Sequence, residues 1–87
     1  MRKIALEGKS LEHLRFYLQN DIKLLKKIFE LLEAIQSEPF KGIGKPEPLR
    51  GELQGYWSRR INNEHRIVYT VTNEYIIVIS YRSHYKM

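Results

Sequence analysis

The sequence predicts an α+β fold in which an N-terminal strand and a two-helix hairpin pack on an antiparallel β-sheet. Two observations support this class. Apolar residues recur at spacings of three and four over residues 10–37, which is typical of amphipathic helices. From residue 56 onward, β-branched and aromatic runs alternate with turn residues, which is typical of antiparallel strands. A chain of 87 residues fits one domain, expected over residues 1–87.

The first half of the chain is expected to hold one strand and two helices. Residues 3–6 form a short strand candidate. Ser10 is expected to cap a first helix that ends near Asn20, and Asp21 to start a second helix that Pro39 closes. Both apolar stripes are expected to pack in the core. The stripes consist of Leu11, Leu14, Tyr17 and Leu18 in the first helix, and of Ile22, Leu25, Ile28, Leu32 and Ile35, widened by Leu24, Phe29 and Leu31, in the second.

Residues 40–48 are expected to form a loop, because they include two glycines and two prolines. Pro46 and Pro48 restrict the backbone of Glu47 to extended conformations, so such a loop would hold the Glu47 carboxylate in a defined place. Taken alone, the segment is better explained as a surface turn with an incidental glutamate. The rest of the chain decides between these interpretations.

Three strands are expected over residues 56–61, 65–71 and 75–81, joined by polar turns into an antiparallel meander. Because side chains alternate along a strand, His65 and Arg66 would point to opposite faces of the sheet. The last strand is apolar on both faces, as expected for a central strand that helices cover on one side.

Charge and composition limit the classes of function. The net charge is +5, of which residues 41–87 carry +4. A basic surface attracts nucleic acid, although many small proteins are basic without binding it. The absence of cysteine excludes a disulfide framework and a thiolate metal site. The apolar run at residues 4–6 is too short for a signal peptide or a membrane span, so we expect a cytoplasmic protein without membrane contact.

The second half carries the residue types that a metal-free ribonuclease needs. A carboxylate, an imidazole and clustered arginines come from four segments, residues 45–49, 57–61, 64–69 and 82–85. A carboxylate can take a proton from a 2′-hydroxyl, guanidinium groups can stabilise a phosphate as its charge grows, and an imidazole can protonate the leaving oxygen. This reaction requires no metal and no cofactor, and we expect none.

The other two histidines are assigned no catalytic role. His13 lies among polar residues of the first helix and is expected at the surface. His65 is expected to pack or to form hydrogen bonds with the sheet. The adjacent pair Glu64 and His65 does not make a metal site, because neighbouring side chains diverge on a strand.

Four motifs in this order resemble the YoeB toxins of the RelE superfamily, the toxic halves of bacterial toxin–antitoxin pairs. They are residues 44–49, 57–61, 64–69 and the terminal pair His84 and Tyr85. The resemblance implies a RelE-like fold and a ribosome-dependent endoribonuclease. Such an enzyme enters the vacant A site of the 70S ribosome, cuts messenger RNA there and is silenced by a YefM-type antitoxin. Relatives also form homodimers.

The resemblance also assigns roles to single residues. Glu47 matches the family's general base, Arg66 its phosphate-binding arginine and His84 its general acid, while Tyr85 matches an aromatic residue that helps to orient the RNA. The residues expected to contact RNA phosphates are Lys45, Arg50, Arg59 and Arg60. Arg50 departs from the family, since relatives commonly have lysine there, and Lys86 and Met87 extend past the usual last residue.

Two alternatives belong to other classes. One is a non-catalytic toxin of the same fold, such as a ParE-like gyrase inhibitor, but such relatives lack the acid–base pair that Glu47 and His84 would form. The other is a basic RNA-binding module, which would need no carboxylate between two prolines. We favour the ribonuclease toxin, mainly because of the motif match.

Overall fold

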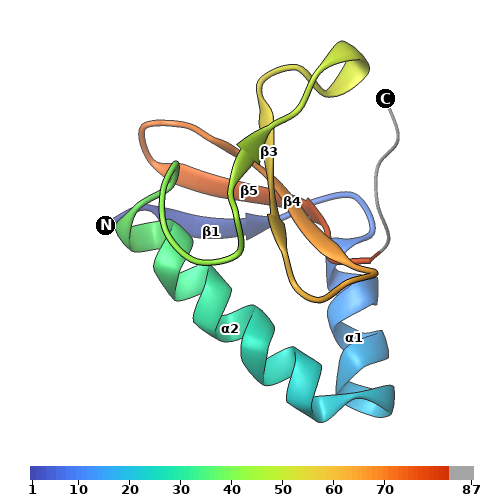
Figure 1. The fold of residues 1–87 in the computed structure, drawn as a ribbon. Helices are drawn as coiled ribbons and strands as arrows, with labels where there is room; N and C mark the ends of the chain where they lie inside the picture. The colour runs from blue at the N-terminus through green and yellow to red at the C-terminus, as the bar shows by residue number, and fades with distance from the viewer. Residues whose placement is uncertain (83–87) are drawn as a thin grey trace.

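The computed structural model of the protein describes residues 1–82, and within them it contains five strands, two α-helices and one short 3-10 helix (Figure 1). The helices occupy the first half of the chain and the meander the second, as the sequence predicts. The elements are β1 Lys3–Leu6, α1 Ser10–Asn20, α2 Ile22–Ser37, β2 Glu47–Pro48, η1 Gly51–Leu53, β3 Tyr56–Arg60, β4 Arg66–Val71 and β5 Tyr75–Ser80.

The described strands form one sheet in the order β1-β5-β4-β3-β2. β3, β4 and β5 pair antiparallel, which confirms the predicted meander, and β2 adds antiparallel to the edge of β3. β1 instead lies parallel to β5, with Ala5 opposite Ile77, so the sheet is mixed rather than wholly antiparallel. A parallel pair needs a long crossover, and α1 and α2 lie within that connection.

The two helices meet at Asp21 and diverge from there on one side of the sheet (Figure 1). Their inner faces pack against β4 and β5, and the buried core consists of Tyr17, Ile28, Leu31, Leu32, Ile35, Ile61, Ile67, Tyr69, Ile76, Val78 and Tyr81. Burial of a large aliphatic side chain contributes about 1.5–3 kcal/mol. Side chains alternate along β3 and β4, so the opposite face of these strands carries Ser58, Arg60, Arg66 and Thr70 together with Tyr56 and the buried Val68.

The starts of the two helices differ from each other. Asp21 caps α2 as predicted, because its Oδ1 accepts a hydrogen bond from the backbone N–H of Leu24 at 3.1 Å. Ser10 does not cap α1; it is the first helical residue, and Lys9 occupies the cap position without a side-chain hydrogen bond. The Ser10 hydroxyl is buried and forms no hydrogen bond within the described structure. Ser10 therefore packs as a small residue.

Both apolar stripes extend beyond the core. Leu11 and Leu18 on α1 are 59% and 60% exposed, and Phe29 on α2 is 55% exposed, so the expectation that the whole stripes are buried is wrong. These three side chains line an apolar groove between α1 and α2 instead of entering the core. Leu14 and Phe29 line two neighbouring apolar grooves of about 370 and 260 Å³.

Candidate functional site

The site begins with the loop after α2, which Arg59 of β3 holds in place. The Arg59 side chain is fully buried. Its guanidinium donates hydrogen bonds to the backbone carbonyls of Glu38, Lys41 at 2.7 Å and Ile43 at 3.1 Å. Its Nε donates to the Tyr69 hydroxyl at 3.1 Å. Arg59 thus replaces the partners that these loop carbonyls would otherwise find in water.

This burial contradicts the expected contact between Arg59 and RNA, because no phosphate can reach an enclosed guanidinium. Tyr69 completes the same network by donating to the carbonyl of Pro39 at 2.8 Å. Burial raises the pKa of Tyr69, while the hydrogen bond and the charge of Arg59 act in the opposite direction. The Tyr69 phenol is therefore a neutral hydrogen-bonding group at physiological pH.

Gly44 fixes the end of this loop against β3. Its carbonyl accepts a hydrogen bond from the backbone N–H of Arg60 at 2.6 Å. Its φ is +85°, and a Cβ at this position would lie 3.0 Å from a methyl group of Leu31 and 3.2 Å from the Cβ of Arg59. Only glycine combines this backbone conformation with so close an approach. Lys45 follows with a φ of +50°.

The backbone then becomes extended at Glu47, as its two proline neighbours predict. Residues 47 and 48 do not remain in the expected loop, however; they form β2, in which Glu47 lies opposite Ser58 of β3. The 3-10 helix after β2 starts beyond Arg50, which is exposed to solvent. Strand pairing, added to proline stiffness, holds the Glu47 backbone in one register.

Glu47, Ser58 and Arg66 meet on the face of the sheet opposite the helices. Ser58 lies opposite Glu47 in the pair of β2 and β3, and opposite Val68 in the pair of β3 and β4, and residues opposite each other share a face. Arg66 lies two positions before Val68 on β4, so its side chain points to the same face as those of Glu47 and Ser58. Arg66 Nη2 donates to Glu47 Oε1 at 2.8 Å, and Arg66 Nε donates to Ser58 Oγ at 2.9 Å. The sequence predicts Glu47 and Arg66 as site residues, but it gives no sign of Ser58 except its register.

Burial differs between the two charged members of this cluster. The Arg66 side chain is 11% exposed and the Glu47 side chain 59% exposed. The arginine is therefore held by its surroundings, while the carboxylate faces solvent, where a substrate can reach it. A carboxylate and a guanidinium so arranged can accept a proton and stabilise an anion within one small volume.

Lys45 and Arg60 lie in a neighbouring cleft rather than in this cluster. Both are exposed, and together with Lys27 of α2 they line a cleft of about 380 Å³ whose apolar floor includes Leu31 and Ile43. The structure thus places two of the expected RNA-binding residues beside a third cation that the sequence interpretation assigns to no site. Positive charges in a cleft attract phosphate backbones.

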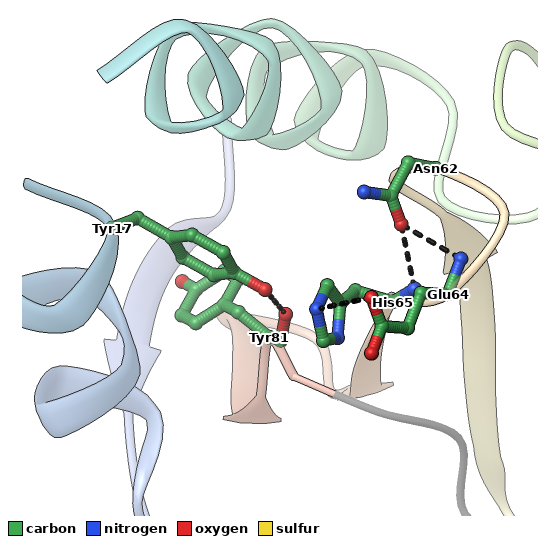
Figure 2. Close-up of polar contacts among 5 residues, drawn as sticks. All are labelled: Tyr17, Asn62, Glu64, His65 and Tyr81. Atoms are coloured by element: carbon green, nitrogen blue, oxygen red, sulfur yellow. Dashed lines mark hydrogen bonds and ion pairs between the residues drawn. The ribbon is translucent and has the colours of Figure 1, made fainter. Parts of the chain in front are cut away.

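The turn before β4 positions His65 next to Arg66. Asn62 Oδ1 accepts hydrogen bonds from the backbone N–H groups of Glu64 at 2.9 Å and His65 at 2.7 Å (Figure 2). The His65 ring packs edge-on against Tyr17, with the centroids 5.9 Å apart, and its Nε2 lies 3.5 Å from Glu64 Oε1. The expectation that His65 packs rather than reacts agrees with this environment.

His84 and Tyr85 lie outside the described residues, so the structure does not place them. The chain that leads to them is described as far as Arg82. The Tyr17 hydroxyl donates to the carbonyl of Tyr81 at 2.8 Å, which joins α1 to the end of β5 (Figure 2). Burial raises the pKa of Tyr17 to about 12, so this hydroxyl keeps its proton at physiological pH.

His13 is not the surface residue that the sequence predicts. Its ring is partly buried, and its Nδ1 accepts a hydrogen bond from the backbone N–H of Tyr81 at 3.0 Å and lies 3.4 Å from Ser80 Oγ. Burial, and then the charge of Arg82, lower the pKa of His13. The residues next to His13 in the sequence do not predict this contact, because its partner Tyr81 lies 68 positions away.

No helix in residues 1–82 is long and apolar enough to cross a membrane. The same residues contain no group of three or more His, Cys, Asp or Glu side chains that could hold a metal ion.

Comparison with known proteins identifies the class. The sequence pattern described as the YoeB-like toxin of bacterial type II toxin-antitoxin systems matches residues 6–85. The fold and the sequence together thus define a small α+β toxin of a type II toxin–antitoxin system. Within this class, the chain belongs to the YoeB-like toxin family.

Individual relatives extend over nearly the whole chain. The chain is 54% identical over 84 residues to the toxin YoeB from Synechocystis, covering 97% of this chain and 98% of that protein. It superposes on the YoeB dimer from Staphylococcus aureus with a TM-score of 0.90 and 46% identity, covering 97% of this chain and 98% of that one. A heterotetrameric YoeB-YefM complex from the same organism gives a TM-score of 0.88 and 45% identity, with 98% and 99% covered.

Proposed function

We propose that this toxin is a ribosome-dependent endoribonuclease that cleaves messenger RNA in the A site by metal-free general acid–base catalysis. The observation that carries the proposal is the contact between Arg66 and Glu47 on the face of the sheet opposite the helices, at 2.8 Å. Ser58 orients the guanidinium from the other side. A largely buried guanidinium and an exposed carboxylate at one place match the two charges that the reaction needs.

In this mechanism, Glu47 takes the proton of the 2′-hydroxyl, and the 2′-oxygen attacks the neighbouring phosphorus. Arg66 stabilises the negative charge that grows on the phosphate. Its bonds to Ser58 and Glu47 use two of the five N–H donors of a guanidinium, which leaves donors for phosphate oxygens. His84 gives a proton to the 5′-oxygen as the bond between phosphorus and that oxygen breaks, and Tyr85 orients the RNA. The products are a 2′,3′-cyclic phosphate and a 5′-hydroxyl.

Binding of the ribosome and of messenger RNA is assigned to exposed cations outside the catalytic cluster. Lys45 and Arg60 line one basic cleft, and Arg50 lies exposed beyond β2. Each phosphate contact releases counterions, so the affinity should fall steeply with salt. Arg59 does not belong to this group, since it is fully buried.

The partners follow from the relatives. The solved YoeB dimer and YoeB-YefM complexes support a homodimer and a YefM-like antitoxin as partners of this chain. Because the proposed substrate is messenger RNA on a translating ribosome, the toxin would act in the cytoplasm. Induced expression should stop growth and shorten messages within coding regions, and a co-expressed YefM-like antitoxin should restore growth.

The decisive experiment is single-turnover cleavage on programmed ribosomes. Glu47→Gln and His84→Gln should each lower the rate by roughly 100-fold or more, since each removes one proton-transfer group. Glu52→Gln is the matched control, because Glu52 is an exposed acid in η1 near β2. Full activity of Glu47→Gln, or a 5′-phosphate product, would exclude this mechanism and favour a toxin that acts by binding alone.

A further inference from the structure

The basic cleft between α2 and the end of β3 contains three cations without a counter charge. Lys27, Lys45 and Arg60 line this space of about 380 Å³, and among residues 1–82 no acidic residue lines it. All three side chains are exposed, and within the described chain none of them forms a hydrogen bond or an ion pair. Like charges gathered in one cleft repel one another, so they do not stabilise the fold. An anionic ligand explains their arrangement better.

The backbone of Lys45 gives a second reason to expect a ligand here. Its φ is +50°, and within residues 1–82 it is the one residue other than glycine with a positive φ. A residue with a Cβ adopts this conformation at a cost in free energy that glycine would avoid. Strain of this kind is typical of binding and catalytic sites. A lysine thus occupies a position that the backbone alone would favour for glycine, which indicates a use for its side chain.

Strand register connects the cleft with the proposed catalytic cluster. Arg60 lies directly opposite Arg66 in the pair of β3 and β4, and two positions beyond Ser58 on β3. Opposite residues have Cβ atoms about 4.5–5.5 Å apart. The cations of the cleft therefore begin one strand spacing from Arg66. Because an RNA strand carries a phosphate at every nucleotide, a strand whose reacting phosphate lies at Arg66 brings a second phosphate close to Arg60.

The floor of the cleft is apolar. It consists of Leu31, which belongs to the core, and of Ile43, whose side chain is 55% exposed. An aliphatic surface can pack against a sugar and against the face of an unstacked base, but it offers no hydrogen bonds to a base edge. The cleft therefore suits a ligand that joins an anion to a flat, weakly polar group, and a nucleotide is such a ligand.

We propose that Lys27, Lys45 and Arg60 form a subsite for the messenger nucleotide next to the cleavage point. The three cations bind its phosphate, and Ile43 packs against its sugar and base. This inference rests on the function proposed above and adds Lys27, to which the sequence assigns no role. An acidic peptide also offers charge to these cations, but the register of Arg60 with Arg66 favours a polymer that enters the catalytic cluster as well.

The test is equilibrium binding to 70S ribosomes that are vacant or programmed with a message whose A-site nucleotides are 2′-deoxy. Such a message lacks the attacking hydroxyl, so binding is measured without cleavage. Lys27→Gln should raise the dissociation constant for programmed ribosomes by roughly 3-fold to 10-fold and lower the salt slope by about 0.7. The dissociation constant for vacant ribosomes should change by less than about 2-fold, because no messenger nucleotide is present there.

Two lysines of α2 provide the matched control. Lys26 is exposed like Lys27 but does not line the cleft, so Lys26→Gln removes the same charge from the same helix. It should change the dissociation constant for programmed ribosomes by less than about 2-fold. Lys27→Arg, which keeps the charge, should stay within about 2-fold of the parent.

A substitution in the floor separates the apolar contact from the charges. Ile43→Ser should raise the dissociation constant for programmed ribosomes by roughly 3-fold, because it removes apolar surface from the contact. The salt slope should stay unchanged, because Ile43→Ser removes no cation. Ile43 is more than half exposed, so the core should tolerate this change.

Three results would overturn the inference. Equal effects of Lys27→Gln and Lys26→Gln would leave only a general attraction of charge. Equal effects of Lys27→Gln on vacant and programmed ribosomes would assign the cleft to ribosomal RNA. Unchanged ribosome affinity together with weaker binding of a YefM-like antitoxin would assign it to a peptide. Cleavage of an unmodified message by the parent toxin tests the proposed function separately, because loss of the subsite leaves that cleavage intact, whereas a parent that does not cleave removes the function itself.

Discussion

Arg66 and Glu47 are 19 positions apart in the sequence, yet the guanidinium of one lies 2.8 Å from the carboxylate of the other. Two strand registers produce this contact. Glu47 pairs with Ser58 across β2 and β3, and Arg66 pairs with Arg60 across β3 and β4. These two registers bring the Arg66 side chain within hydrogen-bond distance of Ser58 and of Glu47. A shift of one residue in either register would turn one side chain to the other face.

The first prediction concerns the shape of the Arg66 side chain. Arg66→Lys keeps the charge, but an ammonium group lacks the planar guanidinium that donates to Ser58 and Glu47 at the same time. The rate of cleavage should therefore fall by roughly 10-fold or more. Ser58→Ala should cause a smaller loss, since the ion pair remains. Single-turnover rates and ribosome affinities measure both effects. Equal rates for Arg66→Lys and the parent would show that charge alone suffices.

The second prediction concerns Arg59. Arg59→Ala leaves three loop carbonyls and the Tyr69 hydroxyl without their donor, so the free energy of unfolding should fall by about 3–5 kcal/mol. Arg60→Ala, at the exposed end of the same strand, should change it by less than about 1 kcal/mol. Urea unfolding monitored by Trp57 fluorescence measures both. Similar losses for the two variants would contradict the structural role of Arg59.

The contrast between Arg59 and Arg60 shows where sequence reasoning stops. The helices, the meander and the Asp21 cap follow from local periodicity and capping chemistry, and the structure confirms them. The sequence does not distinguish the two adjacent arginines, but side chains alternate along a strand. Arg59 is therefore buried, where it binds the loop carbonyls, and Arg60 is exposed. Which face is inner depends on packing with α2, and no local pattern reports that.

The site was partly predictable for a similar reason. Sequence motifs identify Glu47 and Arg66, and the structure brings the two side chains into contact. Their catalytic roles stay predictions. Ser58 and His13 escape such recognition because each acts on a distant partner, Ser58 across a strand pair and His13 across the fold. The parallel pairing of β1 is likewise a long-range choice that alternation cannot predict.

The third prediction compares two glycines with positive φ. Gly44→Ala must place a Cβ 3.0 Å from Leu31 and 3.2 Å from Arg59, whereas Gly55→Ala meets nothing within 4 Å. Both variants strain the backbone, by about 1–2 kcal/mol, but only Gly44→Ala adds overpacking of about 1–3 kcal/mol. Thermal or urea unfolding should therefore rank Gly44→Ala as less stable. The reverse order would contradict the close packing of this loop on β3.

The fourth prediction compares the two helix starts. Asp21→Ala removes the cap of α2 and should lower the free energy of unfolding by about 1 kcal/mol. Ser10→Ala removes a buried hydroxyl that forms no hydrogen bond in the described structure, so it should be neutral or stabilising. Urea unfolding of both variants at one pH tests the pair. A loss of about 1 kcal/mol for Ser10→Ala would indicate a cap at Ser10 after all.

The fifth prediction is a pH dependence of stability that originates at His13. Burial is the largest cause that lowers the pKa of His13 below 6.5, and the nearby charges of Arg82, Glu12, Lys9 and His65 modify it. The unfolded chain therefore binds a proton at His13 at a higher pH than the folded chain does. Between the lowered pKa and 6.5, the free energy of unfolding should decrease as the pH decreases.

The contact itself explains the sign, because protonation of Nδ1 replaces the acceptor of the Tyr81 N–H with a second donor. His13→Asn keeps an acceptor that does not titrate, so its stability should fall less than that of the parent between pH 7.5 and pH 5. Urea unfolding of both proteins across this range gives the difference curve, in which the other titrating groups largely cancel. Parallel curves, or a parent that gains stability relative to His13→Asn at low pH, would show that His13 does not accept this hydrogen bond in the folded protein.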